Sequence, residues 1–174
     1  MGDEDVLIAF DEGQRMHEYS VEEQLIETLH ILAKQNDTPY VIVAGSALED
    51  LLELVLRESM GDLSNPSYSN IFDGLLSTFG AKIGIAYAFK IIGDDLINDF
   101  IAINKVRNEF AHARGPIQFG SSNPKLEKAF KKFSGWTNSS DQRALFDERL
   151  KACMQALNSQ VESAIFIQAW ADVP

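Results

Sequence analysis

The sequence predicts an all-α protein, an irregular bundle of helices that ends in a long C-terminal helix. Two observations predict this class. Apolar residues recur at three- and four-residue spacing along most of the chain, as they do on one face of a helix. Helix-capping residues and Gly or Pro breaks divide that pattern into segments, whereas no alternating run is flanked by hairpin turns. A chain of 174 residues is long enough for one such domain with its own core.

The N-terminal part divides into an arm and the start of the domain. Residues 1–18 are rich in acidic residues and glycine and lack a clear period, which predicts a flexible acidic arm. The single helical domain is expected over 19–174. Its first helix begins at a capping box, because Ser20 is followed three residues later by Glu23.

The next helix is expected to begin with Thr38 as its N-cap and Pro39 as its first helical residue, and to end near Met60. The segment 61–70 combines Asp, Ser, Asn and Pro, which is typical of a loop. Residues 71–76 are then expected to form one helical turn.

A third helix is predicted over 79–92, with Ser or Thr at 77–78 as its cap and Gly93 as its stop. Gly80 and Gly84 lie four residues apart and therefore share a face of this helix. Because glycine destabilises a helix interior, the pair indicates a close approach of another helix, with a ligand as the less favoured alternative.

Three further helices complete the predicted bundle. A fourth helix is expected over 95–113, capped by Asp94 and Asp95. A short basic helix is expected over 123–133, and the long last helix over 140–172. The apolar positions that predict the buried face of the fourth helix are Leu96, Phe100, Ile103, Val106 and Phe110.

Composition restricts the function classes. The formal net charge is −11, which argues against general binding to nucleic acid. The chain has one cysteine, Cys153, so an intramolecular disulfide is impossible. The start of the chain lacks the pattern of a signal peptide, and apolar runs are too short to span a membrane. We therefore expect a cytoplasmic protein.

The charge is unevenly distributed. Residues 1–100 hold 19 acidic and 5 basic side chains, whereas residues 101–174 hold 7 acidic and 10 basic ones. Such unevenness commonly reflects only a solvated helix face, but a basic patch on an acidic protein is the alternative. The residues of this candidate basic patch are Lys105, Arg114, Lys125, Lys128, Lys131 and Lys132.

Signatures of common enzymes are missing from the sequence. It contains no phosphate-binding glycine loop, dinucleotide fingerprint or nucleophile elbow. The three histidines lie far apart, and Cys153 falls on an apolar helix, where a small buried side chain is expected. We therefore expect no metal site and no cofactor. No helix-turn-helix pattern is convincing, which makes direct DNA binding an unfavoured function.

One constellation of polar residues lies near the end of the fourth helix. Asn108 and His112 are four residues apart and share a face, and Arg107 lies about 100° around the helix from Asn108. A guanidinium that stabilises phosphate charge, beside an imidazole that transfers a proton, suits cleavage of a phosphodiester. The structural alternative is that Arg107 pairs with Glu49 or another carboxylate of the second helix.

The motif Arg-Asn-x-x-x-His over 107–112 resembles the signature of HEPN domains, which are small helical bundles that commonly dimerise. This resemblance implies a homodimer, and many HEPN proteins are metal-independent ribonucleases in which two copies of the motif form one site. On that interpretation Arg107, Asn108 and His112 are the catalytic candidates.

A longer match is more specific. Ala-Gly-Ser-Ala-Leu-Glu over 44–49, Ile-Phe-Asp-Gly over 71–74, Ser-Thr-Phe-Gly-Ala-Lys-Ile over 77–83 and the segment 103–112 together resemble the mannitol operon repressor family. The match covers roughly residues 40–115. It implies an all-α fold without a DNA-reading motif, and repression of a sugar-alcohol uptake operon through partner proteins. Gly80 and Gly84 depart from that pattern, which puts a shared ligand or partner in question.

Three hypotheses about function follow. The leading one is a regulator of the mannitol repressor type that acts through protein contacts, in which a polar network of Glu49, Lys82, Arg107 and His112 holds three helices together. The second is a HEPN-type endoribonuclease, toxin-like, that uses the Arg-Asn-x-x-x-His motif. The third is a related domain without catalysis that binds RNA or nucleotides weakly. A buried, fully bonded His112 would favour the first hypothesis, and a His112 that lines a cleft would favour the second.

Overall fold

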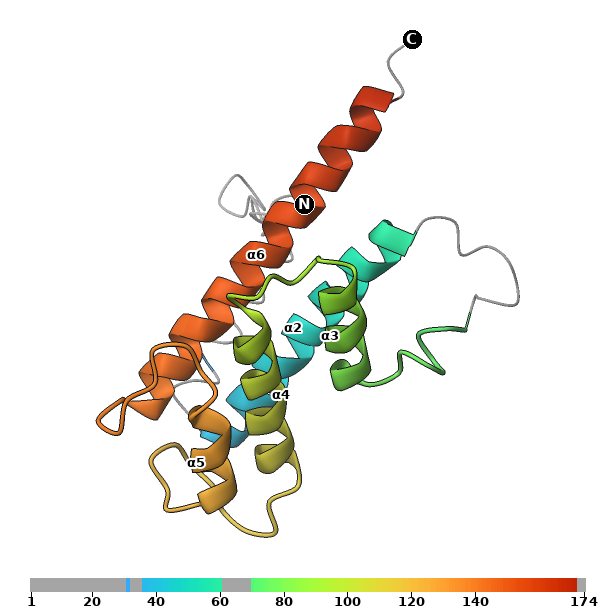
Figure 1. Ribbon diagram of the computed structural model, residues 1–174. Coiled ribbons are helices and arrows are strands. Elements are labelled where there is room, and N and C mark those ends of the chain that lie inside the picture. The colour runs from blue at the N-terminus through green and yellow to red at the C-terminus, as the bar shows by residue number, and fades with distance from the viewer. Residues whose placement is uncertain (1–30, 32–35, 61–69, 172–174) are drawn as a thin grey trace, which may run out of the picture.

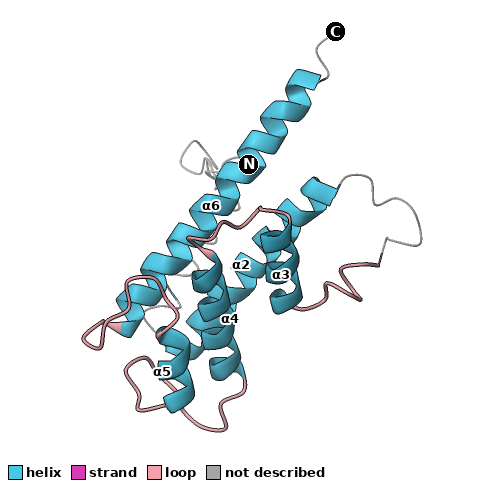
Figure 2. Cartoon of the chain, in the orientation of Figure 1, coloured by secondary structure: helices cyan, strands magenta, loops and turns pink. Residues whose placement is uncertain are grey.

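The computed structural model describes the backbone of Ile31 and of residues 36–60 and 70–171, and the side chains of these residues up to 160. Within these ranges every regular element is a helix, so the predicted all-α class is confirmed (Figures 1 and 2). The predicted acidic arm over 1–18, the capping box at Ser20 and most of the helix that it begins lie outside the described residues.

Helix α2 spans Asp37–Met60 and lies at the centre of the described bundle, where it contacts α3, α4 and α6. It begins two residues before the predicted first helical residue, Pro39, because Asn36 supplies the cap. The side-chain oxygen of Asn36 accepts a hydrogen bond from the backbone N–H of Thr38 at 3.0 Å. The predicted end at Met60 agrees with the structure.

Helix α3 spans Phe79–Ala88 and is capped by Thr78, whose hydroxyl accepts the N–H of Ala81 at 3.2 Å. The predicted extension to residue 92 is wrong. The N–H groups of residues 91 and 92 both bond to the carbonyl of Ala86, at 2.9 and 3.3 Å, and Lys90 has a positive φ of 63°. The chain therefore folds back, which buries Ile92 in the core.

Helix α4 spans Ile97–Ala111, two residues shorter at each end than predicted. Its N-cap is Leu96, which makes no side-chain capping bond. The predicted capping role of the aspartates at 94–95 is therefore wrong. Asp94 instead accepts a hydrogen bond from the Tyr87 hydroxyl at 2.7 Å, which ties the end of α3 to this turn.

Helix α5 spans Pro124–Phe130, and the side chain of Asn123 caps it by accepting two backbone N–H groups at 2.9 and 3.2 Å. The helix ends three residues before the predicted boundary. A turn follows instead, in which the N–H of Phe133 bonds to the carbonyl of Phe130 at 3.0 Å. This turn brings both rings into the core.

The last helix, α6, spans Gln142–Ala171 and lies alongside α2 (Figure 1). It begins after Asp141, whose side chain accepts the N–H groups of Arg143 and Ala144 at 2.8 and 3.1 Å. Its 30 residues correspond to a length of about 45 Å. The long C-terminal helix predicted from the sequence is thus present.

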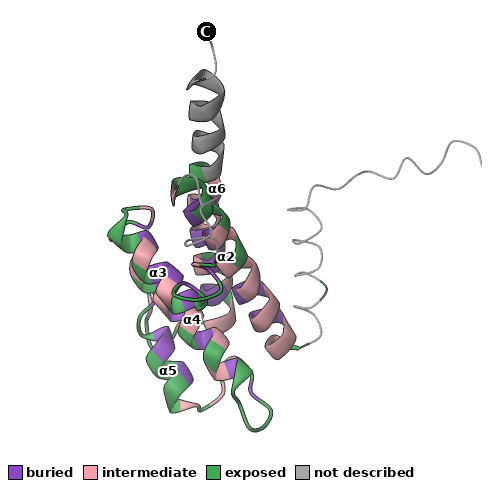
Figure 3. Cartoon of the chain, turned by 90° about the vertical axis from the view of Figure 1, so that its right-hand side faces the viewer, coloured by how far each residue is buried: buried purple, intermediate pink, exposed green. Residues whose placement is uncertain are grey.

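Aromatic rings fill the lower core between α4, α5 and the start of α6. Neighbouring ring centroids lie 5.2–6.3 Å apart with tilted or edge-on geometry, which is favourable for aromatic pairs. Figure 3 shows how buried and exposed positions alternate along the helices. The rings belong to Phe110, Phe119, Phe130, Phe133, Trp136 and Phe146.

The two glycines of α3 behave differently from each other. A Cβ atom at Gly80 would lie 3.4 Å from the side-chain nitrogen of Asn104 on α4, whereas one at Gly84 would meet nothing within 4 Å. Both positions are exposed. The expected close approach of another helix therefore involves only the Asn104 side chain at Gly80, and it is absent at Gly84.

Candidate functional site

Arg107 leaves α4 and crosses the surface of α2. Its Nη1 lies 3.1 Å from Oε2 of Glu49, and its Nη2 donates to the hydroxyl of Ser46 at 3.4 Å. Gly45 makes this path possible, because a Cβ atom there would lie only 2.9 Å from Cδ of Arg107 and 3.2 Å from its Cβ. The lack of a side chain at Gly45 thus leaves room for the aliphatic part of the Arg107 side chain.

Lys82 completes a network among three helices. This lysine of α3 is buried, with 5% of its surface exposed, and its Nζ lies 2.9 Å from Oε1 of Glu49 and 2.8 Å from Oε2 of Glu53. Glu53 also pairs with Arg57, one turn further along α2, at 2.6 Å. Each carboxylate therefore lies between two cations, and α2, α3 and α4 are joined by charged hydrogen bonds.

The network shifts the pKa values of Lys82 and Glu53. Burial alone would lower the pKa of Lys82, but hydrogen bonds and charge from Glu53 and Glu49 outweigh burial and raise it. The hydrogen bond from Lys82 is the main reason that the pKa of Glu53 is lowered, against the opposing effect of burial. Both partners are consequently charged at neutral pH, which is the state in which they hold the helices together.

His112 does not belong to this network, which corrects the sequence-based interpretation. It is the C-cap of α4 and is exposed, and its backbone N–H bonds to the carbonyl of Asn108 at 3.0 Å. Five residues separate it from Arg107, which corresponds to about 140° around the helix. The two side chains therefore point to different sides of α4, whereas Asn108 and His112 share a side.

An open groove of about 850 Å³ lies beside His112, between the end of α4 and the beginning of α5. Asn108 contributes to it as well, and its amide also donates to the side chain of Asn104 at 3.2 Å. Arg107 does not line the groove. The complete lining is Asn108, Glu109, His112, Ala113, Arg114, Ser122, Asn123, Pro124 and Lys125.

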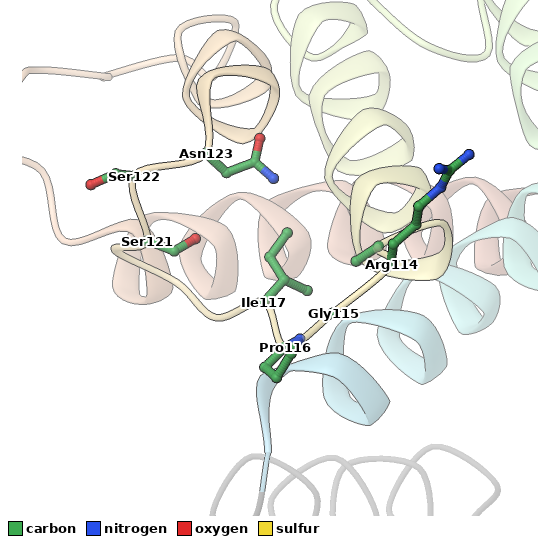
Figure 4. Close-up of a pocket in the computed structure, with 8 residues that line it drawn as sticks. Arg114, Gly115, Pro116, Ile117, Ser121, Ser122 and Asn123 are labelled. Atoms are coloured by element: carbon green, nitrogen blue, oxygen red, sulfur yellow. The ribbon is translucent and has the colours of Figure 1, made fainter.

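A smaller hollow of about 290 Å³ adjoins the groove and shares its loop (Figure 4). Arg114, Ser122 and Asn123 line both spaces. In Figure 4 the Arg114 side chain extends away from Pro116 and Ile117, which belong to the same loop. The loop between α4 and α5 is thus the common wall of the two cavities.

Two helices fix this loop from below. The carboxylate of Asp37, at the start of α2, accepts the N–H of Phe119 at 2.8 Å and pairs with Arg143 of α6 at 2.6 Å. The N–H of Gly120 donates to the side chain of Gln142 at 2.9 Å. Because the Phe119 ring also packs in the aromatic core, the loop has a defined position on the bundle.

The candidate basic patch divides into paired and unpaired cations. Lys131 pairs with Glu127 at 2.7 Å. Among the described residues no ion pair is formed by the other members, which are all exposed. Of these, only Arg114 and Lys125 line the groove. The unpaired members are Lys105, Arg114, Lys125, Lys128 and Lys132.

The sequence patterns considered above did not identify Asp99 as a buried carboxylate. Asp99 of α4 is fully buried; one oxygen accepts the N–H of Ser134 at 2.8 Å, and the other lies 3.8 Å from Arg149 without a hydrogen bond. Burial raises the pKa of Asp99, and the hydrogen bond from Ser134 and the charge of Arg149 only partly oppose this. The signal was available, because Asp99 falls on the apolar stripe of its helix, between Leu96 and Ile103.

Cys153 lies near this carboxylate and is fully buried, as its sequence context predicts. Burial is the main cause of a strongly raised pKa of its thiol, to which Asp99 adds. A thiol in this state is a poor nucleophile. Among the described residues, no group of three His, Cys, Asp or Glu side chains is arranged to hold a metal ion.

Comparisons with known proteins give no relative of this chain. No family model, no curated protein and no solved structure matches it. Within the part of the chain that the structure describes, no helix is both long and apolar enough to cross a membrane. The geometry of the network and of the groove is therefore the basis for a functional proposal.

Proposed function

We propose that this protein is a transcriptional regulator of the mannitol repressor type, which acts through contacts with a partner protein and not through a DNA-reading element. The proposal combines the resemblance over residues 40–115 with the division of the Arg-Asn-x-x-x-His motif between two sides of α4. The single observation that carries it is the engagement of Arg107 by Glu49, because this places the guanidinium in the framework of the fold.

The charge distribution supports a route through a protein partner. A net charge of −11 argues against general binding to DNA. The exposed groove and its unpaired cations supply a positively charged area on one end of the bundle, next to α5. A protein partner can use such a limited area, whereas a DNA duplex requires an extended one.

The test is deletion of the gene in its natural host, with expression of the mannitol-uptake operon measured by quantitative reverse-transcription PCR. We expect expression without mannitol to rise on deletion and to return to its original level when the wild-type gene is restored. In parallel, the purified protein alone should not shift operator DNA in a gel. Unchanged expression after deletion would refute the repressor role, and a shift by the protein alone would refute the indirect route.

A second candidate function, a HEPN-type endoribonuclease, is favoured by one specific observation. His112 is exposed and lines a groove with Arg114 and Lys125, as expected of a proton-transferring group beside a phosphate site. The resemblance implies that a homodimer would bring two copies of the motif together. Arg107 would then have to leave Glu49 to reach the RNA.

Metal-free cleavage of a mixed RNA pool separates the two functions. The wild-type protein is compared with His112→Ala and His112→Asn, which alter an exposed side chain and should fold normally, and with Arg107→Ala. The regulator proposal predicts no cleavage above background for any of them. Cleavage by the wild-type protein that is lost in both His112 variants would instead assign the ribonuclease function.

A further inference from the structure

The arginines within the described residues differ in whether they form ion pairs with carboxylates. Four of them form ion pairs with carboxylates at 2.6–3.8 Å: Arg57, Arg107, Arg143 and Arg149. Arg114 forms none within the described part of the chain. Its charge therefore contributes to the surface and not to the joining of helices.

A second unpaired cation lies on the same groove. Arg114 follows α4, whereas Lys125 is in the first turn of α5, so the two charges reach the groove from different elements. Hydrogen-bonding groups accompany them, since Asn108, Ser122 and Asn123 also line it. This set of side chains suits a ligand that carries several oxygen acceptors and negative charge.

The frame that carries these charges is fixed before any ligand arrives. Asp37 and Gln142 hold the backbone N–H groups of residues 119 and 120, and the side chain of Asn123 caps α5. Little backbone ordering is then required on binding, so more of the interaction energy contributes to affinity.

The composition of the groove favours an acidic peptide over RNA. No aromatic residue is among those that line it, so it lacks a surface on which bases can stack. Its wall also includes Glu109, so the groove holds two positive charges against one negative charge. A short acidic segment can pair its carboxylates with Arg114 and Lys125 without a stacking surface, whereas binding of single-stranded RNA commonly depends on base stacking as well as on charge.

We propose that the groove between α4 and α5 binds an acidic segment of the partner protein, with Arg114 and Lys125 as the residues that contact its carboxylates. This inference rests on the proposed function, because it specifies the chemistry of the partner through which the regulator acts. The groove then selects its partner by the placement of two cations at one end of the bundle, which the carboxylates of the segment must match.

The binding test uses a short, fluorescein-labelled oligo-glutamate peptide and fluorescence anisotropy with the full chain. The double variant Arg114→Gln/Lys125→Gln removes two positive charges from the groove. Lys151→Glu changes the net charge by the same amount at an exposed site on α6 without a described ion pair, and is the matched control. Thermal unfolding of all three proteins by circular dichroism should coincide.

We expect the peptide to bind the wild-type protein and Lys151→Glu with similar affinity, to bind the double variant about tenfold more weakly, and to dissociate on addition of salt. Absence of binding, or equal binding to the double variant, would overturn the proposal. A labelled oligouridine that binds more tightly than the peptide would also overturn it, in favour of RNA. Displacement of the peptide by inorganic phosphate at an equal concentration of negative charge would likewise overturn it, in favour of a simple anion site.

Complementation of the deletion strain separates this inference from the proposed function. If deletion raises operon expression and the double variant fails to lower it, whereas Lys151→Glu succeeds, both proposals are supported. If the double variant restores repression fully, the groove inference fails and the regulator proposal stands. If deletion has no effect on the operon, the regulator proposal fails whatever the peptide binds.

Discussion

Two charged regions lie on opposite sides of helix α4 and use their cations in opposite ways. On the side that faces α2 and α3, Arg107 and the buried Lys82 are matched by the carboxylates of Glu49 and Glu53. On the side that faces α5, Arg114 and its neighbours are exposed and form no described ion pair. Residues close together in sequence therefore serve different purposes, and the difference shows which charges the fold requires and which are available to a partner.

The largest expected effect comes from breaking the paired region at Glu49. The change Glu49→Ala leaves Arg107 without its carboxylate and the buried Lys82 with only one, so we expect the free energy of unfolding to fall by about 3 kcal/mol. Urea denaturation followed by circular dichroism measures the loss. The control is Glu58→Ala, an exposed residue of the same helix, for which a change within about 0.5 kcal/mol is expected. Equal losses in both variants would show that the network is not stabilising.

A smaller effect is expected when alanine replaces either of two glycines, one beside the network and one away from it. Gly45→Ala introduces a methyl group 2.9 Å from Arg107, and the displaced side chain should cost about 1–2 kcal/mol in spite of the better helix propensity of alanine. Gly84→Ala meets nothing within 4 Å and should stabilise the protein by about 0.5–1 kcal/mol. Thermal unfolding midpoints that move in the same direction for both variants would contradict this account.

The smallest effect concerns Asp99, a buried charge with an incomplete set of partners. Because burial raises its pKa, the folded state holds this proton more tightly than the unfolded state does, and the associated stability is lost as pH rises through the folded-state pKa. The substitution Asp99→Asn removes this titration. The free energy of unfolding of the variant minus that of the wild type should therefore increase as pH rises above about 4, the ordinary pKa of an aspartate.

Urea titrations at a series of pH values measure this difference. Arg149 and Ser134 contact Asp99 and the charge of Asp95 lies nearby, and these neighbours are the same residues in both proteins. Stability curves that run parallel over the whole pH range would show that Asp99 keeps the same protonation state folded and unfolded.

Much of the fold was predictable because it depends on local interactions. The caps at Thr78 and Asn123 are side-chain bonds to backbone groups two or three residues away, so a sequence pattern identifies them. The end of α3 was not predictable in this way. It depends on the burial of Ile92 and on the left-handed conformation of Lys90, which only the packed bundle determines.

The candidate site also has a part that local spacing predicts and a part that only the folded chain determines. The spacing in the sequence places Asn108 and His112 on one side of a helix, and the structure has them there. Helical geometry also places Arg107 and His112 about 140° apart, which the sequence interpretation overlooked when it joined them in one network. The groove could not be predicted from the sequence, because the position of its loop depends on a hydrogen bond between Phe119 and Asp37, which are 82 residues apart in the chain.

The unpaired state of Arg114 and Lys125 also has an evolutionary consequence. A mutation at either position removes no ion pair within the described bundle, so it should change the free energy of unfolding little. A mutation at Glu49 or Lys82 should lower that free energy. Related chains should accordingly vary in charge along this groove while they retain the network beneath it. Such a protein can exchange one partner for another by a few substitutions, on a scaffold that selection leaves unchanged.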